Sequence, residues 1–326
     1  MRSPIISVID SRDVSEIVRN QFGLNEQPLV TLLKTGINHT YKVSFGGKDY
    51  VFRLYTHNWR TREEIHAELE LVAELNEKGC SVSVPVATSK GHYLMVVDAA
   101  EGTRFAVLFT YARGQKMIQY ANEQHFEIGK LMGSIHAITI NKAIPRAQYN
   151  YALMYTNGMR EIGRFLGKES AAWKLIEGAG EKLKLVFEQA EKNEWRTGVV
   201  HLDIWFDNLN IDESGRITLF DFDFCGNGPL ALDMAYYIMQ VHRLNTDESI
   251  RKEQINSFIN GYRSVTTLPQ TELDELTALI PAIYIFYLGV QCYRFETWTA
   301  AFLNEVYLER YVDSFVKQWV VESGKF

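Results

Sequence analysis

The sequence of 326 residues predicts an α+β protein, in which a small antiparallel sheet with one prominent helix precedes a mostly helical part. Short strand-like runs dominate the first 111 residues, and few helices interrupt them. After Gly114, apolar residues recur mainly at helical spacing. The chain has only seven prolines and no long Gly/Ser-rich linker, which favours two packed lobes over two tethered domains.

The N-terminal part is expected to begin with a helix that Asp10 or Ser11 caps. Several short strands follow, and Gly46-Gly47 between the second and the third is a hairpin signal. From Arg62 to Lys78 the apolar positions have helical spacing, which predicts the prominent helix. The predicted strands are Leu29–Lys34, Thr40–Phe45, Tyr50–Tyr55, Val84–Ala87, Tyr93–Val97 and Phe105–Tyr111.

The C-terminal part is expected to be helical around Phe126–Ile138, twice within 152–192, and from Asp233 to the end. The exception is Gly198–Gly228, which has the pattern of short strands around polar loops. The most apolar stretch, Ala278–Val290, falls short of the ~20 residues that span a bilayer. It is therefore predicted to be a buried helix.

Composition excludes several classes of function. The net charge of −6 argues against a broad nucleic-acid-binding surface. The N-terminus does not have the pattern of a signal peptide, and no membrane association is expected. Three cysteines, Cys80, Cys225 and Cys292, lack metal-ligand spacing, so we interpret them as reduced core thiols of a cytoplasmic protein.

Two polar clusters, framed by apolar pairs, carry the strongest functional signal. The first is His201-x-Asp203-x-x-x-x-Asn208, and the second is Asp221-x-Asp223. Phosphoryl transfer needs a carboxylate for the attacking hydroxyl and oxygen ligands for Mg²⁺. We therefore expect Asp203 to be the base or orienting group, and Asn208 and Asp221 to hold Mg²⁺. Asp223 is an additional candidate metal or water ligand, and His201 is expected to buttress the loop by hydrogen bonding.

The two clusters and the twelve residues between them resemble the aminoglycoside phosphotransferase/choline kinase family, over about residues 25–300. The resemblance implies a two-lobed, protein-kinase-like fold that uses ATP and Mg²⁺, with GTP as an alternative. It implies a nucleotide-binding lobe over residues 1–111 and a catalytic and acceptor-binding lobe over residues 112–326. The sequence departs from the family pattern at Leu202, where the family most often has glycine, and at Trp205-Phe206.

The N-terminal part has residues at the positions where a kinase needs a phosphate-binding cation and a helix acid. Arg53 ends the third predicted strand, and Glu68 follows 15 residues later on the next helix. The resemblance also places a phosphate-covering loop at Gly36 and Asn38, and adenine-binding backbone groups between Phe109 and Tyr111. The alternative for Arg53 and Glu68 is a surface arginine and an unrelated helix glutamate. The alternative for Gly36 and Asn38 is a plain turn, and for Phe109–Tyr111 it is a strand whose side chains belong to the core.

The favoured function is transfer of the γ-phosphate of ATP to a hydroxyl of a small molecule, such as an amino alcohol, a sugar or an aminoglycoside-like compound. Arg294 and Glu296 are candidate substrate contacts on C-terminal helices. Only nine residues separate Asp223 from Asp233, too few for the long activation segment of eukaryotic protein kinases.

Two alternatives to a small-molecule kinase remain, a protein kinase and a non-catalytic regulator. Phe52-Arg-Leu-Tyr and the run from Trp59 to Glu68 are similar to the bacterial stress response kinase A group, which implies a Ser/Thr protein kinase. Asp221-Phe-Asp-Phe-Cys is similar to the homoserine kinase type II branch, a small-molecule kinase. The other alternative is a non-catalytic nucleotide-binding regulator, which a missing base or metal ligand would favour.

Overall fold

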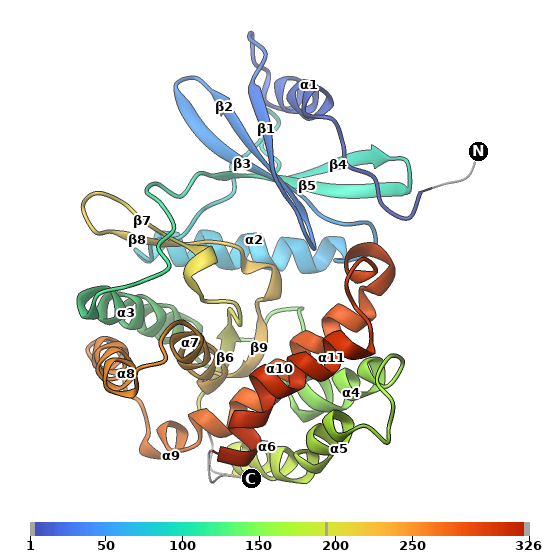
Figure 1. The fold of residues 1–326 in the computed structure, drawn as a ribbon. Coiled ribbons are helices and arrows are strands. Elements are labelled where there is room, and N and C mark those ends of the chain that lie inside the picture. Colours follow the sequence, from blue (N-terminus) through green and yellow to red (C-terminus); the bar gives the residue numbers. More distant parts are fainter. Residues whose placement is uncertain (1–3, 193–194, 323–326) are drawn as a thin grey trace. The chain divides into compact units, whose positions relative to one another are not determined.

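The computed structural model describes residues 4–192 and 195–322, which form two compact units (Figure 1). The first unit comprises Met1–Gly114 and Thr218–Asp221, and the second comprises Gln115–Ile217 and Phe222–Phe326. The short segment Thr218–Asp221 belongs to the first unit because its backbone bonds there: the Leu219 amide donates to the Ser81 carbonyl, and the Ser83 amide donates to the Leu219 carbonyl.

The first unit is built on a five-stranded antiparallel sheet of order β1-β2-β3-β5-β4. Gly46 and Gly47 both have positive φ (56° and 69°), as the tight turn between β2 and β3 requires. Asp10 caps α1, and a capping box of Thr61 and Glu64 starts α2. The elements are α1 (Ser11–Phe22), β1 (Leu29–Thr35), β2 (His39–Phe45), β3 (Lys48–Leu54), α2 (Arg62–Glu77), β4 (Leu94–Ala99) and β5 (Gly102–Thr110).

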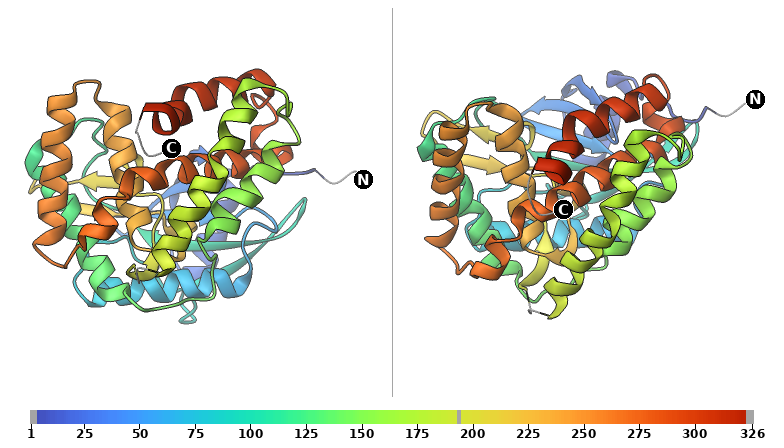
Figure 2. Two further views of the ribbon diagram at one scale, coloured as in Figure 1. Left: turned by 90° about the horizontal axis from the view of Figure 1, so that it is seen from below. Right: turned by 60° about the horizontal axis from the view of Figure 1, so that its bottom comes forward.

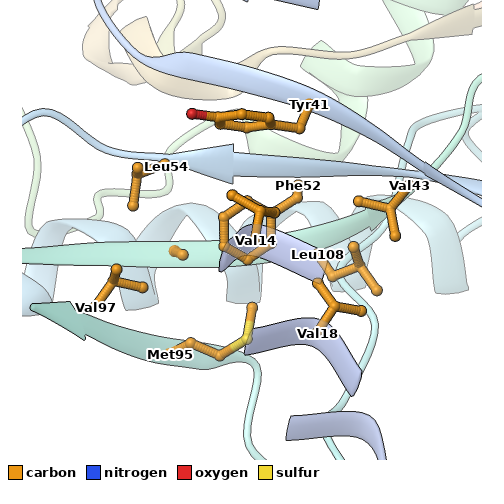
Figure 3. Close-up of a cluster of buried hydrophobic side chains, with 10 residues drawn as sticks. Val14, Val18, Tyr41, Val43, Phe52, Leu54, Met95, Val97 and Leu108 are labelled. Atoms are coloured by element: carbon orange, nitrogen blue, oxygen red, sulfur yellow. The ribbon is translucent and has the colours of Figure 1, made fainter. Parts of the chain in front are cut away.

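The two faces of this sheet are covered by different helices. Strand side chains alternate between faces, so Phe52 and Leu54 pack on one face with Val14 and Val18 of α1 (Figure 3). The opposite face packs against Ile65 and other apolar side chains of α2. This arrangement leaves the odd-numbered positions of β3 directed toward α2.

One predicted strand is wrong. Val84–Ala87 is not a strand of the sheet, and only Pro85 forms an isolated bridge, opposite Phe109. Proline lacks a backbone N–H and interrupts a hydrogen-bonded ladder. The flanking amides still bond, since the Val86 amide donates to the Leu108 carbonyl and the Thr110 amide donates to the Val84 carbonyl.

The second unit is mostly helical, with small strand pairs around its polar loops. β6 pairs antiparallel with β9. Its helices and turns are α3 (Asn122–Thr139), η1 (Ala152–Asn157), α4 (Gly158–Ile162), α5 (Ala171–Gly178), α6 (Gly180–Lys192), η2 (Phe206–Asn208), η3 (Phe222–Phe224), α7 (Ala231–Leu244), α8 (Glu248–Arg263), α9 (Gln270–Leu273), α10 (Leu276–Tyr293), η4 (Phe295–Thr299), α11 (Glu305–Tyr311), η5 (Val312–Val316) and η6 (Gln318–Glu322). Its strands are β6 (Thr197–Val200), β7 (Leu209–Ile211) and β9 (Gly226–Pro229), and β8 (Ile217–Leu219) begins in it.

The helix α10 is the apolar centre of this unit, and Figure 2 shows it crossing α4 and α6. By length and composition α10 could cross a membrane, but 72% of its 18-residue window is buried inside the protein. The prediction of a buried helix at Ala278–Val290 is therefore confirmed. Cys80, Cys225 and Cys292 are all buried and form no disulfide, as predicted.

The helices α3 and α8 approach each other closely because each has a glycine at the contact. A Cβ at Gly129 would lie 2.0 Å from the Phe258 carbonyl oxygen, and one at Gly261 would lie 1.9 Å from that of Phe126. No real Cβ atom tolerates such a distance, and the obstacle on each side is backbone. The crossing therefore depends on both glycines.

We expect Gly261→Ala to lower the free energy of unfolding by about 3 kcal/mol, the upper end of the usual cost of overpacking, because the helices must separate. Gly178→Ala is the matched control, since a Cβ there has no neighbour within 4 Å. That change should raise stability slightly, because alanine has the higher helix propensity. Urea unfolding monitored by circular dichroism measures both. Equal midpoints for the two variants would contradict the close crossing.

Candidate active site

Arg53 lies near the end of β3, on the sheet face that α2 covers. Its neighbours Phe52 and Leu54 are in the α1 core, so the strand period directs Arg53 to the opposite face. On α2, Glu68 comes three residues after the buried Ile65 and one before the buried Leu69, and therefore faces the sheet. The sequence pattern alone thus places the two charges on facing surfaces.

The Arg53 guanidinium joins two carboxylates of the first unit. Its Nη1 lies 2.6 Å from Glu68 Oε1, and its Nη2 lies 3.0 Å from Asp221 Oδ1. The Tyr55 hydroxyl donates to Glu68 Oε2 at 3.0 Å. The exposed fractions of the side chains differ: 9% for Arg53, 1% for Glu68 and 41% for Asp221. Glu68 is therefore a buried anchor, whereas Asp221 is accessible to a ligand.

Asp221 reaches Arg53 through an unusual backbone conformation. Its φ is +67°, in the left-handed region that aspartate tolerates better than most residues. The preceding Leu219 is held by its two backbone hydrogen bonds to Ser81 and Ser83. The sequence predicts Arg53 and Glu68 as a pair and Asp221 as a separate site residue, and the structure brings all three together.

The predicted phosphate-covering loop is pinned to the end of β3. Asn38 Oδ1 accepts a hydrogen bond from the Thr56 amide at 3.2 Å, and the Thr56 hydroxyl donates to the Ile37 carbonyl. The Gly36 amide donates to the Asn38 carbonyl at 3.2 Å. Gly36 and Asn38 therefore shape a tight connection between β1 and β2.

The predicted adenine-binding backbone is partly used within the first unit. Phe109 is buried, it is paired in β5 with Val51, and the Arg53 guanidinium lies 4.9 Å from its ring centroid. Tyr111 follows β5 and is half-buried, and Lys42 Nζ lies 5.3 Å from its ring centroid. Of these two residues, Phe109 therefore has its backbone within the sheet, and Tyr111 has its backbone outside it.

In the second unit, the loop after β6 brings together Asp203 and Asn208. Asn208 Nδ2 donates to Asp203 Oδ2 at 2.7 Å and to the Asp203 carbonyl at 3.0 Å. The Tyr236 hydroxyl donates to Asp203 Oδ1 at 2.6 Å. Burial, together with the adjacent Asp203 carboxylate, raises the pKa of Tyr236 well above its usual range, so the hydroxyl keeps its proton. Both oxygens of the half-buried Asp203 are therefore oriented by donors.

His201 supports this loop, as predicted. Its Nδ1 accepts a hydrogen bond from the Asp203 amide at 3.1 Å, so the ring proton is on Nε2. The ring is 1% exposed and lies edge-on to Phe222, with the centroids 4.5 Å apart. These contacts hold the loop, and they give the ring no direct path to solvent.

The same loop is clamped from α7 by Asp233. Its Oδ2 accepts the His201 amide at 2.8 Å, and its Oδ1 accepts the Leu202 amide at 2.6 Å. Leu202 has φ +57°, a conformation that costs a non-glycine residue roughly 1–2 kcal/mol. This backbone requirement explains why glycine suits the position. Asp233 lies in the first turn of α7, where Leu230 is the N-cap, and its carboxylate bonds the distant loop.

Asp233 is completely buried and is the end of a chain of hydrogen bonds. His136 Nε2 lies 3.1 Å from Asp233 Oδ2, and His136 Nδ1 lies 2.9 Å from the Tyr262 hydroxyl. Arg196 Nη1 donates to the same hydroxyl at 3.0 Å. Because arginine only donates, Tyr262 gives its proton to Nδ1, and Nε2 donates to Asp233. Every bond in the chain thus points toward the carboxylate.

The oxygen donors suit a hard cation. Because Asn208 Nδ2 is committed to Asp203, the amide oxygen Oδ1 is the atom that can bind a cation. Asp221 offers a carboxylate that is 41% exposed. Asp223 is 3% exposed, and its carbonyl accepts a hydrogen bond from Arg146. Within residues 4–192 and 195–322, no three His, Cys, Asp or Glu side chains cluster as a metal site.

Several residues at the site were missed by sequence reasoning. Tyr55, Tyr236 and His136 all bond directly to a charged group of the two units. Tyr55 could have been found, because it lies two residues after Arg53 and on the same sheet face. Nothing in the sequence connects Tyr236 with Asp203. Of the predicted substrate contacts, Arg294 is buried and Glu296 is exposed.

Comparison of the sequence with models of known families identifies the family of this chain. The model of the phosphotransferase enzyme family matches residues 30–268. The chain belongs to this family. The resemblance found in the two polar clusters is thus confirmed, as is the enzyme class, a kinase. A homoserine kinase of Neisseria meningitidis serogroup B is 26% identical over 215 residues, which are 65% of this chain and 66% of that protein.

Solved structures confirm the α+β, protein-kinase-like fold. A microcompartment-associated aminopropanol kinase superposes with a TM-score of 0.78 at 20% identity, and the match covers 96% of this chain and 99% of that one. An amicoumacin kinase in complex with AMP-PNP, Ca²⁺ and Ami superposes with a TM-score of 0.75 at 17% identity, over 97% and 94% of the two chains. At these identities the likeness concerns the fold.

We expect Glu68→Ala to lower the free energy of unfolding by about 3–5 kcal/mol, because it leaves the buried Arg53 guanidinium without its main partner. The double change Arg53→Met/Glu68→Leu should cost less than Glu68→Ala alone, since no buried charge is left uncompensated. Urea unfolding of the three proteins provides the comparison.

Glu74→Ala is the control on the same helix, because Glu74 pairs with Lys78 on the surface at 2.8 Å. Its cost should be about 0–1 kcal/mol. If Glu74→Ala and Glu68→Ala have the same effect, Glu68 is not a buried anchor.

Proposed function

We propose that this protein transfers the γ-phosphate of ATP to a hydroxyl group of a small molecule. The observation that carries the proposal is the geometry of Asp203, whose two carboxylate oxygens are oriented by Asn208 and Tyr236 at 2.7 and 2.6 Å. A fixed, half-buried carboxylate on a clamped loop is what phosphoryl transfer requires to orient an attacking alcohol. Membership of the phosphotransferase enzyme family supports the same reaction.

In this reaction Asp203 accepts a hydrogen bond from the acceptor hydroxyl and takes its proton as the new bond forms. The acceptor oxygen attacks the γ-phosphorus, the bond to the β,γ-bridging oxygen breaks, and ADP leaves. The Tyr236 and Asn208 donors hold the Asp203 carboxylate in one orientation before attack, so that the acceptor hydroxyl meets a fixed partner.

The first unit is proposed to bind the nucleotide. Arg53 would contact the phosphates with its rigid guanidinium fork, and Glu68 would hold the fork in place. The loop at Gly36 and Asn38 would cover the phosphates, and backbone groups around Phe109 and Tyr111 would bind adenine. The nucleotide-binding lobe is thus assigned to residues 1–111, and the catalytic and acceptor-binding lobe to residues 112–326.

Mg²⁺ is the proposed metal. Asn208 and Asp221 would hold it, and Asp223 is an additional ligand that binds it directly or through water. When bound, the ion neutralises charge on the phosphate oxygens. The nature of the donors supports this assignment, because carboxylate and amide oxygens are the ligands that Mg²⁺ prefers. The amicoumacin kinase complex contains a nucleotide analogue and a divalent ion.

The proposed acceptor is a small molecule, such as an amino alcohol, a sugar or an aminoglycoside-like compound. The segment between Asp223 and Asp233 supports a small molecule over a protein acceptor. After η3 this segment forms β9, which pairs with β6, and the chain then enters α7 directly. No residues remain there for an activation segment. We further propose a cytoplasmic protein with no nucleic-acid or membrane partner, which the net charge and the buried cysteines outside any disulfide support.

Asp203→Asn tests the role of the carboxylate. We expect turnover to fall roughly 10²–10⁴-fold, the usual contribution of a general base, while ATP binding and folding persist. ADP release with a panel of amino alcohols, sugars, aminoglycosides and a generic protein measures turnover and the acceptor class together. Asp207→Asn removes a different carboxylate from the same loop and should keep most of the activity. Near-normal kcat in Asp203→Asn would exclude Asp203 as the base.

Asp221→Ala tests the metal assignment. We expect Mg²⁺ to tighten ATP binding to the wild type but not to this variant, because the ion loses an oxygen ligand. Isothermal titration calorimetry with and without Mg²⁺ provides the measurement, and Asp98→Ala, an exposed change on β4, is the control. An unchanged Mg²⁺ effect in Asp221→Ala would make Asp221 structural and assign the metal to Asp223.

A further inference from the structure

Four helical elements of the second unit, α7, α10, α11 and η5, contribute aromatic side chains to one cluster beside Asp203. Tyr236 of α7 bonds Asp203, and its ring centroid lies 5.8 Å from that of Tyr287 of α10. Tyr284 lies one turn before Tyr287 and therefore on the same side of α10. Its ring is 6.0 Å from that of Tyr311 and 5.8 Å from that of Phe315. The tyrosine cluster is defined as Tyr236, Tyr284, Tyr287, Tyr311 and Phe315.

Arg243 adds a positive charge to this cluster. It follows Tyr236 by seven residues, two turns along α7, and thus lies on the same face about 10 Å farther along the helix. Its guanidinium carbon is 4.8 Å from the ring centroid of Phe315. Phe315 is held in turn by Tyr311, with the two centroids 5.1 Å apart. The aromatic contact positions the guanidinium although the side chain is exposed.

No carboxylate neutralises this guanidinium in the part of the chain that the structure describes. Other arginines of the same unit are paired: Arg164 with Glu161 at 2.8 Å, and Arg196 with Glu272 at 2.6 Å. Arg243 is therefore a positioned cation whose hydrogen-bond donors remain available for a ligand.

The electrostatics of the cluster connect Arg243 with the Asp203 end. Burial and the Asp203 charge raise the pKa of Tyr236, and the charge of Arg243 acts on the same hydroxyl in the opposite direction. Arg243 likewise opposes the burial-driven rise in the pKa of Tyr284 and of Tyr311. The contacts agree with this: Asp203 bonds Tyr236 at one end of the cluster, and Arg243 packs on Phe315 at the other end.

We infer that the acceptor alcohol carries a carboxylate group and that Arg243 binds it while Asp203 orients the hydroxyl. This inference rests on the proposed transfer of phosphate to a small alcohol. A guanidinium matches a carboxylate with two parallel hydrogen bonds, and the Phe315 contact reduces the ordering cost of the arginine. The inference narrows the acceptor to hydroxy acids, including hydroxy amino acids, and disfavours purely cationic alcohols.

A simpler role for Arg243 is interaction with the helix dipole, since it lies in the last turn of α7. That role explains the sign of the charge but not its position against Phe315 near Tyr236. Arg263 offers a matched control, because it is also an exposed arginine in the last turn of a helix, α8. A dipole effect would be common to both residues, whereas acceptor binding would be specific to Arg243.

The experiment compares alcohols that differ only in the carboxylate: serine with ethanolamine, homoserine with propanolamine, and threonine with isopropanolamine. ADP release gives kcat/KM for each member of a pair. We expect the wild type to prefer at least one carboxylated member by about 10- to 100-fold, the range for charged hydrogen bonds. Arg243→Ala should bring this ratio near one, Arg243→Lys should retain part of it, and Arg263→Ala should keep the wild-type ratio. Circular dichroism and ATP binding check that each variant is folded.

The possible failures are distinguishable. If the wild type phosphorylates the decarboxylated members equally well, or if Arg243→Ala keeps the preference, the inference is overturned and the proposed phosphotransfer stands. If no acceptor is phosphorylated, calorimetric titration of each acceptor in the presence of ADP measures its binding instead. Binding of a carboxylated member that Arg243→Ala abolishes would then support the inference and count against phosphotransfer. If the carboxylated members neither react nor bind, the inference is overturned.

Discussion

The buried carboxylate of Asp233 holds the loop that carries Asp203 and Asn208. It accepts the amides of His201 and Leu202, and the backbone between them is in a conformation that leucine disfavours. Two charged hydrogen bonds are sufficient to offset that strain. They set the direction in which the chain leaves Leu202, and so the position of Asp203, the next residue. Without the clamp, Asn208 and Tyr236 would have no fixed carboxylate to orient.

A fully buried carboxylate is stable only if its charge is satisfied, and here the donors form an ordered series. Glu272 pairs with Arg196, which donates to Tyr262, and the bonds continue through His136 to Asp233. Hydrogen bonds that all point the same way polarise one another. Burial raises the pKa of Tyr262 to about 12, so this tyrosine remains a donor across the physiological range. The loop is therefore supported from α3 and α8 as well as from α7.

The two units use their carboxylates in parallel ways. Glu68 and Asp233 are fully buried and hold other groups in place, whereas Asp221 and Asp203 are accessible and keep the capacity to bind a ligand. In each unit an inaccessible carboxylate thus positions an accessible one, through Arg53 in the first unit and through the loop backbone in the second. Exposure separates the supporting role from the candidate chemical role.

Sequence patterns predicted the parts of this arrangement that depend on local periodicity. The period of two in β3 places Arg53 opposite Glu68, and Gly46-Gly47 specifies the turn before it. The spacing of Asp203 and Asn208 predicted a pair that does form. Tyr236 and the Asp233 clamp were not predictable in this way, because their partners lie more than thirty residues earlier in the chain. The strand predicted at Val84–Ala87 was wrong for a local reason. Its apolar composition suited a strand, but Pro85 within it has no amide to pair.

The position of each role along α7 explains why the acceptor is harder to derive from sequence than the reaction. Asp233 in the first turn holds the loop, Tyr236 one turn later contacts Asp203, and Arg243 in the last turn lies beside Phe315. Asp203 and Asn208 are only five residues apart in the chain, so a short sequence motif identifies them. The tyrosine cluster instead combines α7 with α10, α11 and η5, so under the proposed role substitutions on those elements would change the acceptor without altering the loop. Because Asp233 and Tyr236 belong to the same helix, any movement of α7 would displace the loop clamp and the donor to Asp203 together, which keeps the two contacts in register.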